Sequence, residues 1–141
     1  SIFFGVVGCT CLLLAKKFEV PHGYIPVTYQ ELQANYAAGE DIPTRAFELE
    51  GKKVFVKGYM YPSKRIYGLK EFIISRENGS CEYCTPNPTP TDLLAVKLAG
   101  DKSTNYTQHI IALGGILRVE TDPAKIARDG VVYHLEADYI K

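Results

Sequence analysis

From residue 53 to its end, the chain contains short runs in which apolar and polar positions alternate. These runs lie at residues 53–61, 70–75, 93–98, 108–120 and 131–141. Alternation with period two, together with many β-branched and aromatic residues, predicts half-buried β-strands. Five strands of this kind predict a mainly β fold, a small OB-like antiparallel barrel. A β-sandwich is the alternative.

Two glycines and two short helical segments complete this prediction. Gly114 and Gly115 interrupt the long fourth run, and glycine weakens a strand unless the strand bends or bulges there. Residues 28–39 predict a short amphipathic helix, because Thr28 is followed three residues later by a glutamate, as in a capping box. Residues 123–130 predict one or two helical turns with a proline in the first turn.

The start of the chain has a different pattern. Residues 2–15 carry no charge, and Lys16 and Lys17 follow at once. Fourteen residues of helix span about 21 Å, so further residues upstream of the serine at position 1 would be needed to cross a hydrocarbon core of about 30 Å. We interpret the run as an uncleaved N-terminal membrane helix. A cleaved signal peptide, a lipidation site at Cys9 and a buried core helix are the alternatives.

The predicted membrane residues are the large apolar ones of this run: Ile2, Phe3, Phe4, Val6, Val7, Leu12, Leu13 and Leu14.

Three parts follow from this pattern. Residues 1–17 form the membrane anchor, residues 18–45 a connector that includes the short helix, and residues 46–141 the barrel domain. Prolines and a glycine between residues 18 and 27 predict extended backbone in the first part of the connector. Residues 40–53 predict a linker that turns near Gly51.

The charge balance narrows the class of partner. The chain has 16 basic and 16 acidic residues, and nothing in this balance indicates a nucleic-acid partner. The basic groove and stacked aromatic residues of nucleic-acid-binding OB folds are not evident either. One local group of cations is interpreted as solvated surface: Lys52, Lys53, Lys57, Lys64 and Arg65.

Cys81 and Cys84 are the main candidates for chemistry. Structural zinc normally takes four protein ligands in two pairs, and only one Cys-x-x-Cys pair is available; His109 and His134, on neighbouring predicted strands, are weaker candidates to complete a site. A redox dithiol is disfavoured because the prolines that follow cannot form the helix that lowers the pKa of the first thiol. A local disulfide or two inert thiols are the favoured interpretation, with a metal site as the alternative.

The proline-rich segment after the cysteines is also a candidate contact surface, because extended backbone can lie in a partner's groove. The candidate contact residues are Tyr83, Pro86, Asn87, Pro88 and Pro90. A rigid surface loop is the alternative.

Several of these motifs together resemble a bacterial domain family of unknown function that occurs in extracytoplasmic and lipoprotein-like proteins. The matching positions are Leu49, Gly51, Lys52, Val54, Gly58, Tyr59, Met60, Pro62, Glu71, Phe72, Cys81, Pro86, Pro88 and Pro90. The resemblance covers roughly residues 24–140. It implies an OB-like barrel in a periplasmic setting and no known activity. Many relatives have a histidine where this chain has Tyr83, so a metal site of the family does not transfer.

These observations predict a non-catalytic accessory subunit with a single membrane helix. We expect a bacterial inner-membrane protein whose domain lies on the periplasmic side, beside membrane lipid and a larger respiratory, photosynthetic or transport complex, without a cofactor and without nucleic acid. No enzymatic activity is expected, since the sequence has no nucleophile elbow, phosphate loop or paired-carboxylate motif. The alternative is an anchored periplasmic domain that binds a metal ion or thiols through Cys81 and Cys84.

Overall fold

The computed structural model describes residues 19–34, 41–76 and 89–141. The strands are β1 (Ile25–Pro26), β2 (Lys53–Met60), β3 (Glu71–Ser75), β4 (Leu93–Leu98), β5 (Ile111–Val119) and β6 (Tyr133–Ile140). The helices are α2 (Tyr29–Leu32), α3 (Thr44–Leu49), the 3-10 turn η2 (Pro90–Asp92) and α4 (Pro123–Asp129).

Five of the strands form a closed barrel. The sheet order is β1-β2-β3-β4-β6-β5, and β5 pairs back onto β2. The sequence predicted a wholly antiparallel barrel, but β4 and β6 run parallel; the other four barrel pairings are antiparallel. The connection from β4 to β6 passes through β5 and α4, and this long connection allows the parallel pairing. Every barrel strand is therefore paired on both sides.

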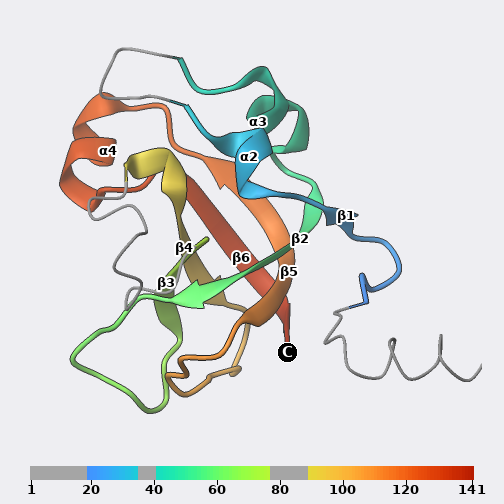
Figure 1. The fold of residues 1–141 in the computed structure, drawn as a ribbon, viewed down its shortest axis with the longest axis vertical. Helices are drawn as coiled ribbons and strands as arrows, with labels where there is room; N and C mark the ends of the chain where they lie inside the picture. The colour runs from blue at the N-terminus through green and yellow to red at the C-terminus, as the bar shows by residue number, and fades with distance from the viewer. Residues whose placement is uncertain (1–18, 35–40, 77–88) are drawn as a thin grey trace, which may run out of the picture.

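The helices and the long loops lie at opposite ends of the barrel. In Figure 1, α2, α3 and α4 gather at the upper end, whereas the β2–β3 loop, the β4–β5 loop and the C-terminus lie at the lower end. Leu32, Ala46 and Leu49 bring α2 and α3 into the same hydrophobic core as the strands. Core burial therefore closes one end of the barrel, and the loops are left to project from the other.

The predicted bulge in the long strand is confirmed. The register between β5 and β6 shifts between Gly114 and Gly115, since Gly114 pairs with Tyr139 but Gly115 pairs with Ala137. A Cβ atom on Gly115 would overlap the carbonyl oxygen of Glu136 and lie 2.6 Å from the Cα of Ala137. Only glycine lets the two backbones approach this closely.

The helices agree with the sequence in part. Among the described residues, the helix predicted over residues 28–39 is present only as α2, which ends at Leu32 because Gln33 has extended backbone. The capping box at α2 is confirmed, because the Glu31 carboxylate accepts a hydrogen bond of 2.7 Å from the Thr28 backbone N–H. α4 spans Pro123–Asp129, as predicted, and its N-cap Asp122 accepts from the Ala124 N–H at 3.0 Å. α3 was missed: the sequence indicated a linker there.

The described chain before α2 is fixed to the outside of the barrel. β1 pairs with the start of β2, and the Val27 N–H donates to the Phe55 carbonyl at 2.9 Å. The Tyr24 hydroxyl donates to Asp138 Oδ1 at 2.6 Å. The Tyr24 ring packs over Gly114, where an added Cβ atom would lie only 2.7 Å from the ring. We call residues 24–27 the strap.

Within residues 19–34, 41–76 and 89–141, no helix is long and apolar enough to cross a membrane. The predicted membrane helix, with all its membrane residues from Ile2 to Leu14, lies outside these described residues.

Candidate functional site

A groove of about 780 Å³ lies over the outer face of β3, β4 and β6. Its middle is one row of cross-strand partners, in which Ile73 pairs with Ala95 and Ala95 pairs with His134. These three side chains are half-buried, and their neighbours along each strand are buried in the core. Strand alternation therefore directs this row away from the core and makes it the floor of the groove.

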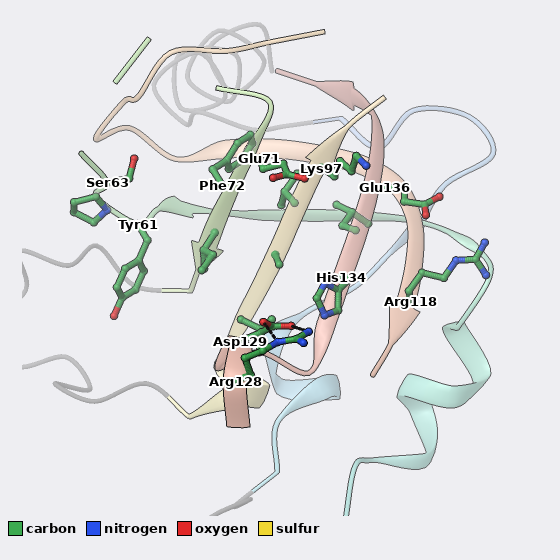
Figure 2. Close-up of a pocket in the computed structure, with 16 residues that line it drawn as sticks. Tyr61, Ser63, Glu71, Phe72, Lys97, Arg118, Arg128, Asp129, His134 and Glu136 are labelled. Carbon is green, nitrogen blue, oxygen red and sulfur yellow. Dashed lines mark hydrogen bonds and ion pairs between the residues drawn. The ribbon is translucent and has the colours of Figure 1, made fainter. Parts of the chain in front are cut away.

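The next row carries alternating charges. Glu71 of β3 pairs with Lys97 of β4, and Lys97 pairs with Glu136 of β6. All three residues are exposed. Opposite charges at directly facing positions of a sheet attract one another, and at this exposure the attraction is weak because water screens it. This row forms a polar rim at one end of the groove, and Figure 2 shows Glu71 and Lys97 close together there.

The other end of the groove is lined from α4. Arg128 Nε lies 3.0 Å from Asp129 Oδ1, and a second guanidinium nitrogen donates to Asp129 Oδ2 at 3.3 Å. This two-point hydrogen bond lowers the pKa of Asp129 and raises the pKa of Arg128. The pair is exposed and lies beside His134 in Figure 2. Arg118 of β5 also lines the groove and pairs in register with His134.

Tyr61, Pro62 and Ser63 form the remaining wall, at the start of the β2–β3 loop. The Tyr61 N–H donates to the Ile73 carbonyl at 2.8 Å, so this wall is attached to the edge of the floor. Tyr61 is 37% exposed and provides an aromatic surface next to the apolar floor.

The chemistry of the groove suits binding. Its lining includes three cations, Lys97, Arg118 and Arg128, and three carboxylates, Glu71, Asp129 and Glu136. The Ser63 hydroxyl and the His134 ring lie on opposite sides of the groove in Figure 2, so they do not form a nucleophile–base pair. Among residues 19–34, 41–76 and 89–141, no three His, Cys, Asp or Glu residues come together as a metal site.

The structure places the two predicted histidines far apart. His134 lies in the floor of the groove, whereas His109 is exposed and precedes β5. His134 pairs with Arg118, and β5 begins seven residues earlier at Ile111, which corresponds to about 23 Å of strand. The structure does not bring His109 and His134 together.

Of the predicted contact residues, Pro90 is described. It is half-buried at the start of η2, and its carbonyl accepts from the Val132 N–H at 3.0 Å. The predicted metal or disulfide pair, Cys81 and Cys84, lies outside the described residues. So do the contact candidates Tyr83, Pro86, Asn87 and Pro88.

The sequence did not indicate Ile73, Ala95, Arg118 or Arg128 as site residues. Strand alternation identifies outward positions, but only the pairing of β4 with β6 places Ala95 beside His134. These residues are 39 positions apart (134 − 95), and no local pattern encodes their register. α4, which carries Arg128, was predicted without its place on the barrel.

The comparisons with known proteins reveal the fold alone. The sequence matches no protein-family model, and no curated protein matches it. A crystal structure of a DUF3299 family protein from Pseudomonas aeruginosa PAO1 is similar, with a TM-score of 0.57 and 17% sequence identity over 84% of this chain and 95% of that chain. That family is of unknown function and bacterial, as was the family whose motifs the sequence resembles.

Proposed function

We propose that this chain is a non-catalytic binding domain that holds a segment of a partner protein in the groove over β3, β4 and β6. The observation that carries the proposal is the groove itself. Its volume of about 780 Å³ lies within the range of about 300–1,000 Å³ that is usual for ligand sites. It combines an apolar floor with polar groups at both ends, the usual composition of such sites.

The position of the groove supports an OB-type barrel. Numbering the barrel strands from β2 gives the closed order 1-2-3-5-4-1. The groove lies over the second, third and fifth of these strands, with walls from the loop between the first two and the loop between the last two. OB folds bind their ligands at these places. Fold analogy alone does not assign a function; the side chains that line the groove indicate the class of ligand.

The lining favours a polypeptide over a nucleic acid. Three cations and three carboxylates balance, whereas a phosphate backbone attracts an excess of cations. Because every barrel strand already has two neighbours, the partner segment would cross the strands and would not add to a sheet edge. We infer an apolar side chain of the partner on Ile73 and Ala95, with charged groups beside it facing the Glu71–Lys97 row and the Arg128–Asp129 pair.

The binding domain is, in our proposal, the periplasmic part of a single-pass inner-membrane accessory subunit, held by residues 1–17 beside a larger membrane complex. The uncharged run at residues 2–15 supports this part of the proposal independently of the groove.

In-cell photocrosslinking tests the groove. A photoreactive phenylalanine analogue at Tyr61 would lie on the groove wall, and mass spectrometry would identify the crosslinked partner. We expect one partner, and we expect Ala95→Arg to reduce the crosslink about tenfold or more, because the larger charged side chain fills the floor.

The matched control is Lys57→Glu, since Lys57 is exposed on β2 and outside the groove. It should leave the crosslink unchanged. Both variants should melt as the unmodified protein does. A crosslink that survives Ala95→Arg in a folded protein would rule out the groove as the contact.

A further inference from the structure

The β2–β3 loop, residues 61–70, carries two adjacent large apolar side chains that point into solvent. Ile66 is 46% exposed and Tyr67 is 68% exposed. The other exposed large apolar residues of the described chain outside this loop, Val20 and Phe47, are single and distant in sequence. Single exposed apolar residues are ordinary on protein surfaces, whereas an adjacent exposed pair in the middle of one loop indicates a contact.

Hydrogen bonds hold the loop in this form. The Tyr106 N–H donates to the Ile66 carbonyl at 2.8 Å, and Leu69 and Thr104 exchange backbone hydrogen bonds of 2.7 and 2.9 Å. Within the loop, the Ser63 hydroxyl donates to the Arg65 carbonyl at 2.7 Å. The β4–β5 loop therefore braces the β2–β3 loop, and the apolar pair is exposed because the backbone is fixed that way.

The charges of the loop all have one sign. Lys64, Arg65 and Lys70 are exposed cations, and residues 61–70 contain no carboxylate. Arg65 Nε donates to the Tyr67 carbonyl at 3.0 Å, which keeps this guanidinium beside the apolar pair. The nearest acidic residue in sequence is Glu71, which follows the β2–β3 loop directly. The β4–β5 loop, which braces it, carries Asp101.

We propose that residues 64–70 of this loop are a contact site for an anionic lipid surface. Ile66 and Tyr67 would enter the region between lipid headgroups and acyl chains, where a tyrosine ring can keep its hydroxyl in water. Lys64, Arg65 and Lys70 would lie at the lipid phosphates, with their aliphatic stems along the apolar pair. This assigns a role to Lys64 and Arg65, which the sequence pattern indicated only as solvated surface.

The shape of the loop favours lipid over a protein partner. A stable protein interface buries about 800 Å² on each side, far more than two side chains at the end of one loop provide. Each cation near an anionic membrane strengthens association about fivefold, and salt weakens this effect because the Debye length is about 8 Å at physiological ionic strength. The contact would orient the domain at the surface and would not hold it there alone.

Hydrogen exchange of the full chain tests this site, and the readout is residues 64–70, because residues 61–63 also form a wall of the groove. The chain would be reconstituted into phosphatidylcholine vesicles with or without phosphatidylglycerol, and exchange would be followed by mass spectrometry. We expect amides of residues 64–70 to exchange about tenfold more slowly on the anionic vesicles only, and less so at high salt. Peptides from α4, at the other end of the barrel, should exchange equally on both.

Two variants separate the apolar and the charged contributions. Ile66→Ser with Tyr67→Ser, and separately Lys64→Gln with Lys70→Gln, should each abolish the difference between the two vesicles. The matched controls are Val20→Ser with Phe47→Ser, and Lys52→Gln with Lys125→Gln, which alter exposed residues elsewhere and should preserve it. Thermal melts would verify that all four proteins fold.

Equal exchange of residues 64–70 on both kinds of vesicle would overturn the proposal. So would protection that requires a co-purified protein and persists in detergent without lipid, because the loop would then contact that protein.

Discussion

The two adjacent glycines of β5 are required for different reasons. At Gly114, a side chain would meet the ring of Tyr24, which lies across the strand. At Gly115, a side chain would meet the backbone of β6 at the bulge. A ring can shift by a few tenths of an ångström, whereas a paired strand cannot shift without losing hydrogen bonds. Gly115 should therefore be the less tolerant position.

We expect Gly115→Ala to lower the free energy of unfolding by about 3 kcal/mol, the upper end of the usual range for a single substitution. Gly100→Ala is the control, since Gly100 has a positive φ of 60° but no atom within 4 Å of the place that its Cβ would take. Its expected effect is about 1–2 kcal/mol, from backbone strain alone. Urea denaturation measures both, and equal midpoints for the two variants would contradict the bulge.

Tyr24 and Asp138 make the strap sensitive to acid. The hydrogen bond from Tyr24 is the main cause that lowers the pKa of Asp138, and Lys53 contributes through an ion pair of 3.1 Å. The same hydrogen bond raises the pKa of Tyr24 to about 12. A carboxyl group whose pKa is lower in the folded state stabilises that state above its unfolded pKa, about 3.9, and loses this effect as the pH falls through the folded value.

We expect Tyr24→Phe to lower the free energy of unfolding by about 1 kcal/mol at pH 7. This is below the usual value for a charged acceptor, because the Asp138 side chain is 40% exposed and water screens it. The difference from the unmodified protein should shrink as the pH falls below the unfolded pKa of an aspartate, about 3.9, and through the lower folded value. Denaturant titrations at pH 7 and at a series of lower pH values measure it. A difference that stays constant with pH would show that Asp138 does not contribute through its charge.

At the scale of elements, a buried hydroxyl joins the end of α2 to η2. Thr91 is fully buried; its hydroxyl donates to the Ala34 carbonyl at 3.0 Å and accepts from the Ala34 N–H at 3.1 Å. Beside it, the Tyr133 hydroxyl donates to the Leu32 carbonyl at 2.6 Å. These bonds satisfy backbone groups that the short helix leaves without partners at its C-terminal end.

Thr91→Val keeps the shape of the side chain and removes its hydroxyl. We expect a loss of about 2 kcal/mol in the free energy of unfolding, because both polar groups of Ala34 are left without this partner. Thr121→Val, at an exposed threonine, is the control and should change stability by less than about 0.5 kcal/mol. If the two variants unfold at the same urea concentration, the hydroxyl does not stabilise this junction.

The elements that the sequence predicted are those with a local pattern. Alternation located the five barrel strands, the capping box located the start of α2, and the proline in its first turn located α4. α3 has six residues and begins after Pro43, so it has little helical signal of its own; Ala46 and Leu49 stabilise it by packing in the core. The groove depends on pairings between distant strands, and these come from closure of the barrel.

At the scale of the whole molecule, residues 1–17 are predicted to be a unit separate from the barrel. The first core residue in the described chain is Val27, and the strap begins at Tyr24. A protein that starts at residue 18 should therefore fold, remain monomeric and melt near the temperature of the full chain. Circular dichroism and gel filtration in the absence of detergent measure this.

A second truncation, starting at residue 28, removes the strap and Val27 and is the matched comparison. It should be clearly less stable, because the β1–β2 pairing and the Tyr24–Asp138 hydrogen bond are lost. Aggregation of the protein that starts at residue 18 would mean that residues 2–15 are part of a core and not a membrane helix.

The cysteine pair should matter little for the stability of the barrel. Cys81 and Cys84 enclose only two residues, and a disulfide across so short a loop stabilises at the low end of about 0–5 kcal/mol. On one side of their segment, Ser75 is paired with Leu93 in the sheet; on the other, Thr91 is bonded to Ala34. Both anchor points are held without the cysteines.

If the domain faces the periplasm, the two thiols should be oxidised to each other or protected by a partner. Mass spectrometry with and without reductant shows whether the disulfide is present, and a thermal melt of the same samples measures how much it contributes to stability. We expect the melting temperature to fall by only a few degrees on reduction, which corresponds to a loss of about 1 kcal/mol or less in the free energy of unfolding. The double variant Cys81→Ser with Cys84→Ser should behave like the reduced protein. Loss of the folding transition on reduction would make the pair a main structural bond. Two thiols that are free and alkylated at once would indicate a reducing compartment, and would reverse the proposed orientation of the anchor.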